Sequence, residues 1–441
     1  MPEQNLRPRL TLTLLTLLNF FNYIDRNILF GVQPLIKDEF HVSDAKLGFL
    51  TTAFFICYMF VSPVIGVLAD RWSRRVIIVL GALLWSAATL LTAITHNYTE
   101  LLVRHTVVGI GEATFVVIAP AYIADLFSIE RRGRMLAYFY LAIPVGSAVG
   151  YIVGGFLGTK YGWRAPFYVG AVPGILVGLA FLFTREPQRG STEHIQRAPE
   201  AKLSGFASNS ASPIVRLLMA IPAIRRFVHT LLGLARNPAF WTATLGMAMF
   251  TFVVGGIQVW MPSFLARVHH IPLDRANLNL GAITVIDGFA ATLIGGWLGD
   301  QYLKRRASAY YILSAVSMLL AFPAALLAFY GPISWMYAAM YVAEFFLFLN
   351  TGPLNAAIVN SVSPAIRATA VGMNLLIIHI LGDVPSPLLI GFISDRSSLR
   401  AGFSVALIAM LLSAAVLFYG ARFAPRIQLS EKTVSSGASA G

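Results

Sequence analysis

The chain has 441 residues, of which 57% are hydrophobic and only 12% are charged, and its mean hydropathy is +0.71. A soluble globular protein would carry about twice this charged fraction, so the composition excludes that class. A single cysteine, Cys57, excludes disulfides within the chain and any cysteine-based metal cluster.

Twelve apolar stretches, each long enough to cross a bilayer as a helix, follow one another along the chain. Proline, glycine and charged clusters separate them. The first is too long and too charged for a cleaved signal peptide. The pattern predicts an all-α integral membrane protein with spans over residues 10–36, 45–69, 76–96, 99–127, 135–159, 164–184, 239–266, 276–300, 309–330, 334–362, 366–394 and 400–421.

A long polar break lies between the sixth and seventh spans, over residues 185–238. It begins rich in serine and alanine, and over 213–236 it continues with apolar residues among arginines. This second part fits an interfacial helix, and a disordered linker is the alternative. We therefore expect an N-terminal six-helix bundle (1–184), a cytoplasmic linker (185–238), and a C-terminal six-helix bundle with a short tail (239–441).

The placement of lysine and arginine predicts the orientation of the chain. With the N-terminus in the cytoplasm, more than two thirds of the 33 Lys and Arg residues fall in loops on that side. Both termini are then cytoplasmic. The net charge of +13 is a topology signal under this assignment, so no nucleic-acid partner is expected.

An internal repeat indicates how the spans are organised. Residues 66–75 read GVLADRWSRR after the second span, and residues 296–306 read GWLGDQYLKRR after the eighth. A second echo pairs SIERRGR at 128–134 with SPAIRAT at 363–369. Two six-span halves, each with a Gly-x-Leu-x-Asp turn, resemble the major facilitator superfamily. The resemblance implies two pseudo-symmetric bundles with the substrate site between them, near the middle of the membrane.

The repeated turn also suggests a gate. Gly66 would let the second span approach a neighbour closely, because glycine has no side chain. In the family, the equivalent of Asp70 caps the start of span 11, and the following arginine meets an acid that ends span 4. A simple topology anchor is the alternative. The resemblance implies a cytoplasmic latch made of Gly66, Asp70, Arg71, Arg74, Asp125, Asp300 and Arg305, with Arg71 paired to Asp125.

Three strings narrow the resemblance to the Spinster transporters, whose animal members move sphingosine-1-phosphate or lysophospholipids. They are FNYIDR at 21–26, GVLADRWSRR at 66–75, and GIGEAT at 109–114 followed by APAYIADLF at 119–127. The family arginine upstream of GIGEAT aligns with His105 here, and Arg104 is shifted by one position. The fifth span contains PVGSAVGYIVGG at 144–155, which resembles the antiporter motif of the superfamily, with close helix packing as the alternative. The compact termini suggest a bacterial relative.

Charged residues inside the spans are the candidates for function. Asp25 and Arg26 lie near the middle of the first span, where a charge costs at least about 2.5–3.5 kcal/mol and normally faces a bundle interior or a wet cavity. Glu112 lies level with them in the fourth span, so we expect Arg26 to pair with Glu112. Asp25 is then the acid left free to titrate, and we assign proton coupling to Asp25 and Glu112. A purely structural ion pair is the alternative.

Polar and aromatic residues near these charges complete the candidate substrate site. Arg26 is expected to bind an anionic headgroup with its planar guanidinium. Charges at the centre with apolar walls suit an amphiphile better than a polyol. The full set of candidate substrate-binding residues is Asn22, Tyr23, Arg26, Phe54, Tyr58, Glu112, Tyr122, Glu344, Asn350, His379 and Asp383.

These patterns predict a proton-coupled secondary transporter that moves a lysolipid-like or sphingoid-phosphate-like substrate by alternating access. A multidrug or organic-anion exporter of the same fold is one alternative, and a non-transporting membrane receptor is another. No enzyme activity, cofactor or metal is expected, since the sequence lacks a nucleotide loop and a nucleophile elbow. We expect a monomer in the bacterial inner membrane, with the amphiphile, protons and the bilayer as partners.

Overall fold

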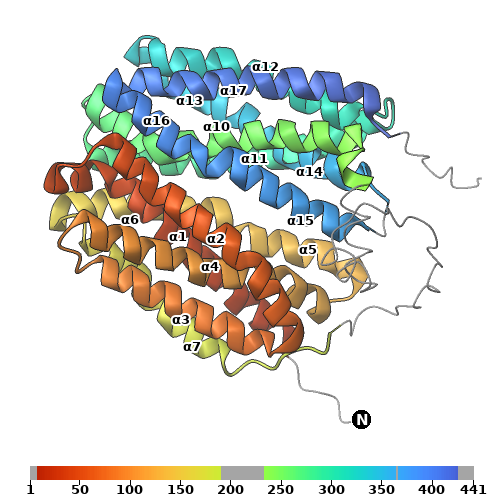
Figure 1. Cartoon of the computed structure of the whole chain (residues 1–441), viewed down its shortest axis with the longest axis horizontal. Coiled ribbons are helices and arrows are strands. Elements are labelled where there is room, and N and C mark those ends of the chain that lie inside the picture. The colour runs from red at the N-terminus through yellow and green to blue at the C-terminus, as the bar shows by residue number, and fades with distance from the viewer. Residues whose placement is uncertain (1–6, 190–232, 364–365, 426–441) are drawn as a thin grey trace, which may run out of the picture.

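The computed structural model of the chain describes residues 7–189, 233–363 and 366–425, and within them it contains helices and no strands. The interfacial helix expected over 213–236 lies largely outside these residues. Twelve spans are present in the described part, some of them built from two consecutive helices (Figure 1). In chain order they are α1 (Pro8–Phe40), α2 (Asp44–Arg71), α3 (Arg74–Thr92), α4 (Tyr98–Leu126), α5 (Ile129–Tyr140) with α6 (Ala142–Tyr161), α7 (Ala165–Phe181), α10 (Pro238–Val268), α11 (Leu273–Leu303), α12 (Ala309–Tyr330), α13 (Ile333–Leu349) with α14 (Thr351–Asn360), α15 (Arg367–Ile378) with η2 (His379–Asp383) and α16 (Pro385–Arg396), and α17 (Leu399–Gly420).

Apolar length and polar caps explain where the spans begin and end. Ten of the spans are long and apolar enough to cross a membrane, and the charged α1 and the shorter α7 complete the set. Five spans begin at a polar cap whose side chain accepts a hydrogen bond from the amide three residues later, which satisfies a free donor of the first turn. These caps are Ser43, Ser73, Asn97, Asn237 and Ser398. The predicted all-α membrane fold is confirmed.

Three spans are interrupted along their length. The helix of the fifth span is interrupted at Leu141, three residues before Pro144, and that of the tenth at Asn350, three residues before Pro353. The eleventh contains the short π-helix η2, which the amide of Val384 closes by donating to the His379 carbonyl at 3.0 Å. Such irregular turns inside helices often occur at functional sites.

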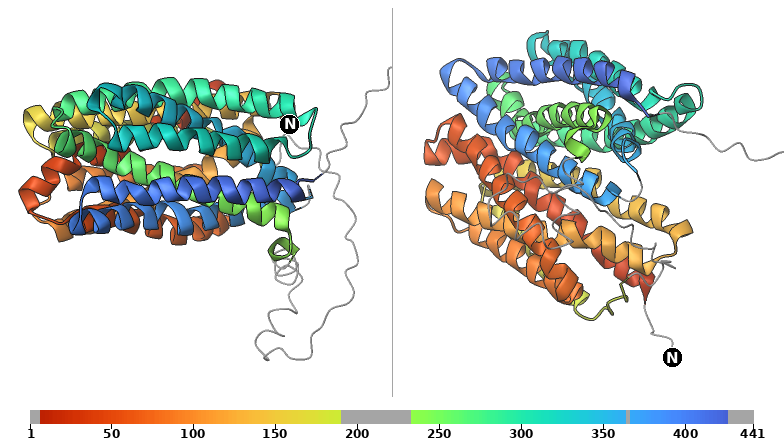
Figure 2. Two further views of the ribbon diagram at one scale, coloured as in Figure 1. Left: turned by 90° about the horizontal axis from the view of Figure 1, so that it is seen from above. Right: turned by 45° about the vertical axis from the view of Figure 1, so that its right-hand side comes forward.

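The helices form two halves, α1–α7 and α10–α17, whose axes run roughly together (Figures 1 and 2). Within the first half α1 packs on α6, α3 on α4, and α2 on α4; within the second, α10 and α12 pack on α17. Between the halves, α6 packs on α11, α2 on α16, and α1 on α10. The interface between the halves is therefore made by long helices from each.

The two membrane faces of the molecule differ. We call the face where α1 begins and α17 ends the terminal side, on the right in Figure 1, and the face where α1 ends and α2 begins the far side. The far side is closed by Asp44, which forms an ion pair with Arg267 (2.8 Å) and accepts a hydrogen bond from Ser394 (2.6 Å), both from the other half. Lys37 of its own half also pairs with Asp44.

A second far-side contact caps a helix of one half with a carboxylate of the other. The backbone amides of Asp44 and Ala45, at the start of α2, donate to the two oxygens of Asp395 in α16 at 2.7 and 2.8 Å. A carboxylate is favourable there, because the N-terminus of a helix carries a partial positive charge. Asp44 and Asp395 thus lock α2 onto α10 and α16.

Backbone contacts extend this closed interface toward the middle of the membrane. Asn277 of α11 donates to the Gly31 carbonyl of α1 at 3.1 Å, and Tyr151 of α6 donates to the Gln258 carbonyl of α10 at 2.8 Å. Thr52 of α2 donates to the Val384 carbonyl at 2.6 Å. The cross-half contacts named here therefore run from the far side toward the middle of the interface.

The glycines of the repeated turn show the consequence for the terminal side. A Cβ placed on Gly66 or Gly296 would meet no heavy atom within 4 Å. The close approach expected at Gly66 is therefore absent, and this expectation is corrected: the end of α2 is not packed against a neighbour there. The contacts described above close the interface on the far side, whereas the glycines of the repeated turn face open space on the terminal side.

Candidate functional site

Arg26 and Glu112 form an ion pair in the middle of the first half. Arg26 lies halfway along α1 and reaches Glu112 of α4 through Nη2 and Oε2. The side chain of Glu112 is fully buried and that of Arg26 is 15% exposed. Charges withdrawn from water to this degree require a partner, because an unpaired one costs several kcal/mol. The pairing predicted from the sequence is confirmed.

Aromatic rings surround the guanidinium of Arg26. Its Cζ lies 5.0 Å from the ring centroid of Tyr23, 5.1 Å from that of Phe54 and 5.6 Å from that of Phe55. A guanidinium over an aromatic face gains about 0.5–1 kcal/mol at exposed sites and more where water is excluded. The rings therefore stabilise the Arg26 guanidinium, which contacts Glu112 through one of its nitrogen atoms only.

The aromatic group continues from the first half into the second. Phe55 stacks on His379 of η2, with ring centroids 5.7 Å apart, and Tyr58 lies edge-on to the same imidazole at 5.8 Å. Nδ1 of His379 is 2.7 Å from Oδ2 of Asp383, one π-turn later. Together Arg26, Glu112, Tyr23, Phe54, Phe55, Tyr58, His379 and Asp383 form what we call the central cluster.

Two further polar residues border the central cluster. Asn22, one helical turn before Arg26, is fully buried. His105 of α4 stacks on Phe54, one of the rings next to the Arg26 guanidinium, with 5.3 Å between the two ring centroids. Arg104 points elsewhere: it donates to the Leu91 carbonyl at 2.6 Å and pairs with Glu100. The histidine rather than the arginine thus faces the interior at this position.

Asp25 does not share the surroundings of Arg26. Its carboxylate accepts a weak hydrogen bond from Thr89 of α3 at 3.4 Å, and a Cβ on Gly170 of α7 would lie 2.3 Å from Oδ1. Asp25 is 3% exposed, and no described lysine or arginine pairs with it. Asp25, the acid that we expected to be left free to titrate, therefore has no cationic partner among the described residues. It lies between α1, α3 and α7 and is not a member of the central cluster.

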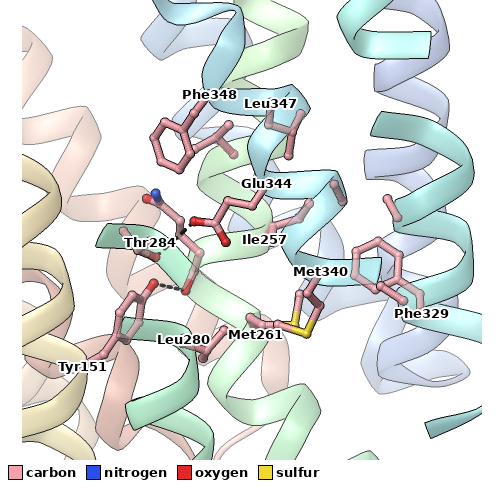
Figure 3. A pocket seen from close by; sticks show the side chains of 15 residues that line it. Tyr151, Ile257, Met261, Leu280, Thr284, Phe329, Met340, Glu344, Leu347 and Phe348 are labelled. Atoms are coloured by element: carbon pink, nitrogen blue, oxygen red, sulfur yellow. Dashed lines mark hydrogen bonds between the residues drawn. The ribbon is translucent and has the colours of Figure 1, made fainter. Parts of the chain in front are cut away.

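Glu344 belongs to a separate pocket, which helices of the second half and Tyr151 of α6 line (Figure 3). Thr284 of α11 donates to its Oε1 at 3.0 Å, and Tyr151 of α6 closes one side by its bond to the Gln258 carbonyl. The remaining walls are mostly apolar: Val254, Ile257, Met261, Leu280, Ala325, Ala328, Phe329, Met340, Ala343, Leu347 and Phe348. No residue of the central cluster lines this pocket. Asn350 is buried at the break between α13 and α14, where it bonds to the Phe346 carbonyl.

Tyr122 lies far from the central cluster, at the terminal side. Its hydroxyl donates to the Arg185 carbonyl at 3.2 Å, and the guanidinium of Arg74 lies over its ring at 5.2 Å. We expected Tyr122 among the aromatic residues that surround the mid-span charges. The distance along the helix explains the error, since ten residues span about 15 Å. Tyr122 instead supports the α2–α3 turn.

The terminal-side turn is held by Arg74. Its guanidinium bonds to Asp125 of α4 at 2.6 Å and to Glu186 after α7 at 3.2 Å. Arg71, which we expected to pair with Asp125, is exposed, so the partner in this state is corrected to Arg74. Glu186 also accepts from Ser73 and from the amides of Arg74 and Arg75. Partial burial raises the pKa of Glu186, but these hydrogen bonds outweigh it and hold that pKa below its ordinary value.

The second copy of the turn is less connected. Asp300 accepts a hydrogen bond from Tyr310 at 2.8 Å, and Arg305 is exposed. The side chain of Asp70 lies outside those that the structure describes, so its expected cap on the eleventh span stays a prediction. The residues that we did not foresee are Phe55 in the central cluster, His105 at its border, and Asp44, Arg267 and Asp395 at the far side. Phe55 adjoins Phe54 in the sequence, but the far-side residues carry no pattern that marks them.

Comparisons with known proteins agree with this arrangement. The family model described as Major Facilitator Superfamily matches residues 15–382. "Protein spinster homolog 1" of Xenopus tropicalis is 33% identical over 397 residues, which cover 86% of this chain and 71% of the relative. "Sphingosine-1-phosphate transporter SPNS2" of Danio rerio is 33% identical over 417 residues, which cover 90% and 77%.

Solved structures show the same fold. A bacterial homologue of the human lysosomal transporter Spinster, described as inward-facing and unoccupied, superposes with a TM-score of 0.80 at 24% identity, covering 96% of this chain and 98% of that one. A D-xylose–proton symporter gives a TM-score of 0.72 at 16% identity, covering 94% and 97%. Sequence identity at this level supports a shared fold and does not indicate which substrate this chain moves.

Proposed function

The chain belongs to the Spinster family of the major facilitator superfamily, and from this we propose that it is a proton-coupled carrier of an amphiphile with an anionic headgroup. The substrate class is a lysolipid or a sphingoid phosphate. The observation that carries the proposal is Arg26, a mid-membrane cation that is paired on one side only and flanked by aromatic rings. The naming of a zebrafish relative as a sphingosine-1-phosphate transporter supports the same class.

The central cluster has groups that can bind both the anionic headgroup and the hydrocarbon of an amphiphile. Arg26 can present its second guanidinium edge to a phosphate or carboxylate, and such bidentate contacts are among the strong ones. Phe54, Phe55 and Tyr58 provide apolar surface next to it. The largely apolar pocket around Glu344 is a second place for hydrocarbon, and its carboxylate would favour a cationic group on the ligand.

Protons enter the proposal through Glu112 and Asp25. When an anionic headgroup binds the second edge of Arg26, Glu112 shares its counter-ion with the ligand, and a buried carboxylate that is less well compensated is protonated more readily. Asp25 has no cation partner among the described residues, so it can gain or lose a proton without breaking an ion pair. Both steps link proton binding to substrate binding.

Alternating access would move the halves about the central cluster. We assign the domains as residues 1–184, 185–238 and 239–441, and we place both termini in the cytoplasm on the charge pattern. The terminal side is then cytoplasmic and the state described here is open inward. Closure on that side would use the latch residues Gly66, Asp70, Arg71, Arg74, Asp125, Asp300 and Arg305. We propose a monomer in a bacterial inner membrane.

Flux into proteoliposomes tests the proposal. A lysophosphatidate and a sphingoid phosphate are compared with a neutral monoacylglycerol, a sugar and a cationic drug, each with and without a pH gradient. We expect uptake of the two anionic amphiphiles that increases with the gradient and is abolished by a proton ionophore. Flux of the cationic drug alone would favour a multidrug exporter, and tight binding of the amphiphiles without any flux would favour a receptor.

A further inference from the structure

A basic groove lies on the terminal side, outside the central cluster and the Glu344 pocket. It is enclosed by the start of α1 and by the corner where α4 passes into α5. Its volume is about 880 Å³, counting the space open to solvent, which is within the range of small-molecule sites. The lining residues are Arg7, Pro8, Arg9, Leu10, Leu126, Phe127, Ser128 and Arg131.

The arginines of this groove have no hydrogen-bonding or ion-pair partner in the part of the chain that the structure describes. Arg7, Arg9 and Arg131 are exposed, and among the described residues none of their guanidinium groups takes part in a hydrogen bond or an ion pair. The lining contains no carboxylate. This differs from Arg26, Arg74, Arg164 and Arg267, each of which pairs with an acid. Three cations that converge without a counter-ion repel one another unless an anion joins them.

The apolar residues of the groove indicate the kind of anion. Leu10, Leu126 and Phe127 form its floor, and Leu10 is 46% exposed. The groove lies at the end of the spans, where the hydrocarbon of a bilayer meets its headgroups. Basic pockets between transmembrane helices at this level bind the phosphates of lipid headgroups. A free phosphate would use the arginines but would leave the apolar floor uncovered.

We propose that this groove binds the phosphate of an anionic membrane lipid, with Arg7, Arg9 and Arg131 on the headgroup and Leu10, Leu126 and Phe127 against the adjoining glycerol and upper acyl chain. The site belongs wholly to the first half and shares no residue with the central cluster or the Glu344 pocket. It therefore goes beyond the proposed function and stands whatever substrate the carrier moves.

The test measures ligand-dependent thermal stability of the purified full chain in a neutral detergent. The probes are a short-chain phosphatidylglycerol, a phosphatidylcholine with the same acyl chains, and inorganic phosphate. Arg9→Gln/Arg131→Gln is compared with the parent protein and with Arg306→Gln, an exposed arginine on the same side of the other half. We expect phosphatidylglycerol to stabilise the parent, and its half-saturating concentration to rise by about tenfold or more in the double variant only.

Several outcomes would overturn the proposal. Equal stabilisation by phosphatidylcholine would show that the groove does not require a net anionic headgroup. Parent-like affinity in the double variant would show that Arg9 and Arg131 do not bind the lipid. If inorganic phosphate stabilised the protein as much as phosphatidylglycerol does, with the same half-saturating concentration, the groove would be a site for a free anion rather than for a lipid. If the double variant does not fold, Arg131→Lys serves instead, since it keeps the charge but loses the planar fork. A severalfold weaker response is expected for it, and unchanged affinity contradicts the site.

Discussion

Arg26 is held by one carboxylate and three aromatic rings, and these neighbours explain why lysine cannot replace it. A lysine at this position keeps the charge but has neither the planar stacking surface nor two parallel donors. We expect Arg26→Lys to weaken binding of the anionic amphiphile about tenfold, equivalent to ~1.4 kcal/mol, which is the scale of one or two lost cation–π contacts. Equilibrium binding to the detergent-solubilised protein measures this, with Arg104→Lys as the matched control. Equal affinity in both variants would place the headgroup elsewhere.

Asp25 allows proton coupling to be separated from substrate binding. It is buried with one weak hydrogen bond from Thr89, so Asp25→Asn changes little in packing but removes the titratable group. We expect this variant to bind substrate and to lose the stimulation of flux by a pH gradient. Asp287→Asn, which alters another buried acid in the second half, is the control and should keep the stimulation. Gradient-driven flux at the parent rate in Asp25→Asn would rule Asp25 out as a coupling residue.

The pairing of Arg26 with Glu112 could be predicted from the sequence, whereas the surroundings of Asp25 and Tyr122 could not. Arg26 and Glu112 were paired because a mid-span charge needs a partner and both lie at the same depth. Neighbours on a helix point about 100° apart, so Asp25 had to face another direction, but which direction depends on how α3 and α7 pack. Tyr122 was misplaced because a shared helix does not imply a shared depth.

Individual helices show how far apolar length alone determines the fold. The expected spans agree with the observed helices to within a few residues, because the hydrocarbon thickness fixes how many apolar residues each needs. The π-helix at His379–Asp383 was not foreseen. No proline lies within it, and its extra residue is defined by hydrogen bonds that no sequence period reveals. That break nevertheless turns His379 toward Phe55.

The turn between α2 and α3 makes a pH-dependent contribution to stability that depends on Glu186. Because hydrogen bonds hold the pKa of Glu186 below its ordinary value, the ionised form stabilises the fold at neutral pH, and this is lost as pH falls through the lowered pKa. Glu186→Gln should lower the melting temperature at pH 7 by about 2 °C or less, since the group is partly exposed. The difference should shrink as the pH falls below about 4, from the ordinary pKa of a glutamate toward the lowered pKa of Glu186.

The control for this measurement is Asp38→Asn, a change of an exposed carboxylate that has no hydrogen bond or ion pair in the described part of the chain. It should melt like the parent at each pH. A deficit in Glu186→Gln that stays constant at pH values well below 4 would show that the carboxylate charge does not act here.

The molecule as a whole is closed by contacts concentrated at one end, so one residue should shift its conformational balance. Asp44 joins α2 to α10 and α16, and charge-assisted hydrogen bonds of this kind contribute about 1.5–3 kcal/mol each. Asp44→Asn should therefore shift the equilibrium toward a far-side-open state by about tenfold or more. Spin-label distances between the α1–α2 and α10–α11 connections measure this shift. Asp274→Asn, an exposed change on the same side, should leave the distances as in the parent, and parent-like distances in Asp44→Asn would contradict the role of the clamp.

The position of Lys37 has a consequence for how often this clamp can be broken. A carrier must part its far-side contacts once in every cycle, and stripping a buried carboxylate of all its partners each time would make that step very slow. Asp44 keeps Lys37, which moves with it in the same half, when Arg267 and Ser394 depart. The residue therefore keeps a counter-ion throughout the cycle, which lowers the barrier to opening and lets the same contact form and break repeatedly.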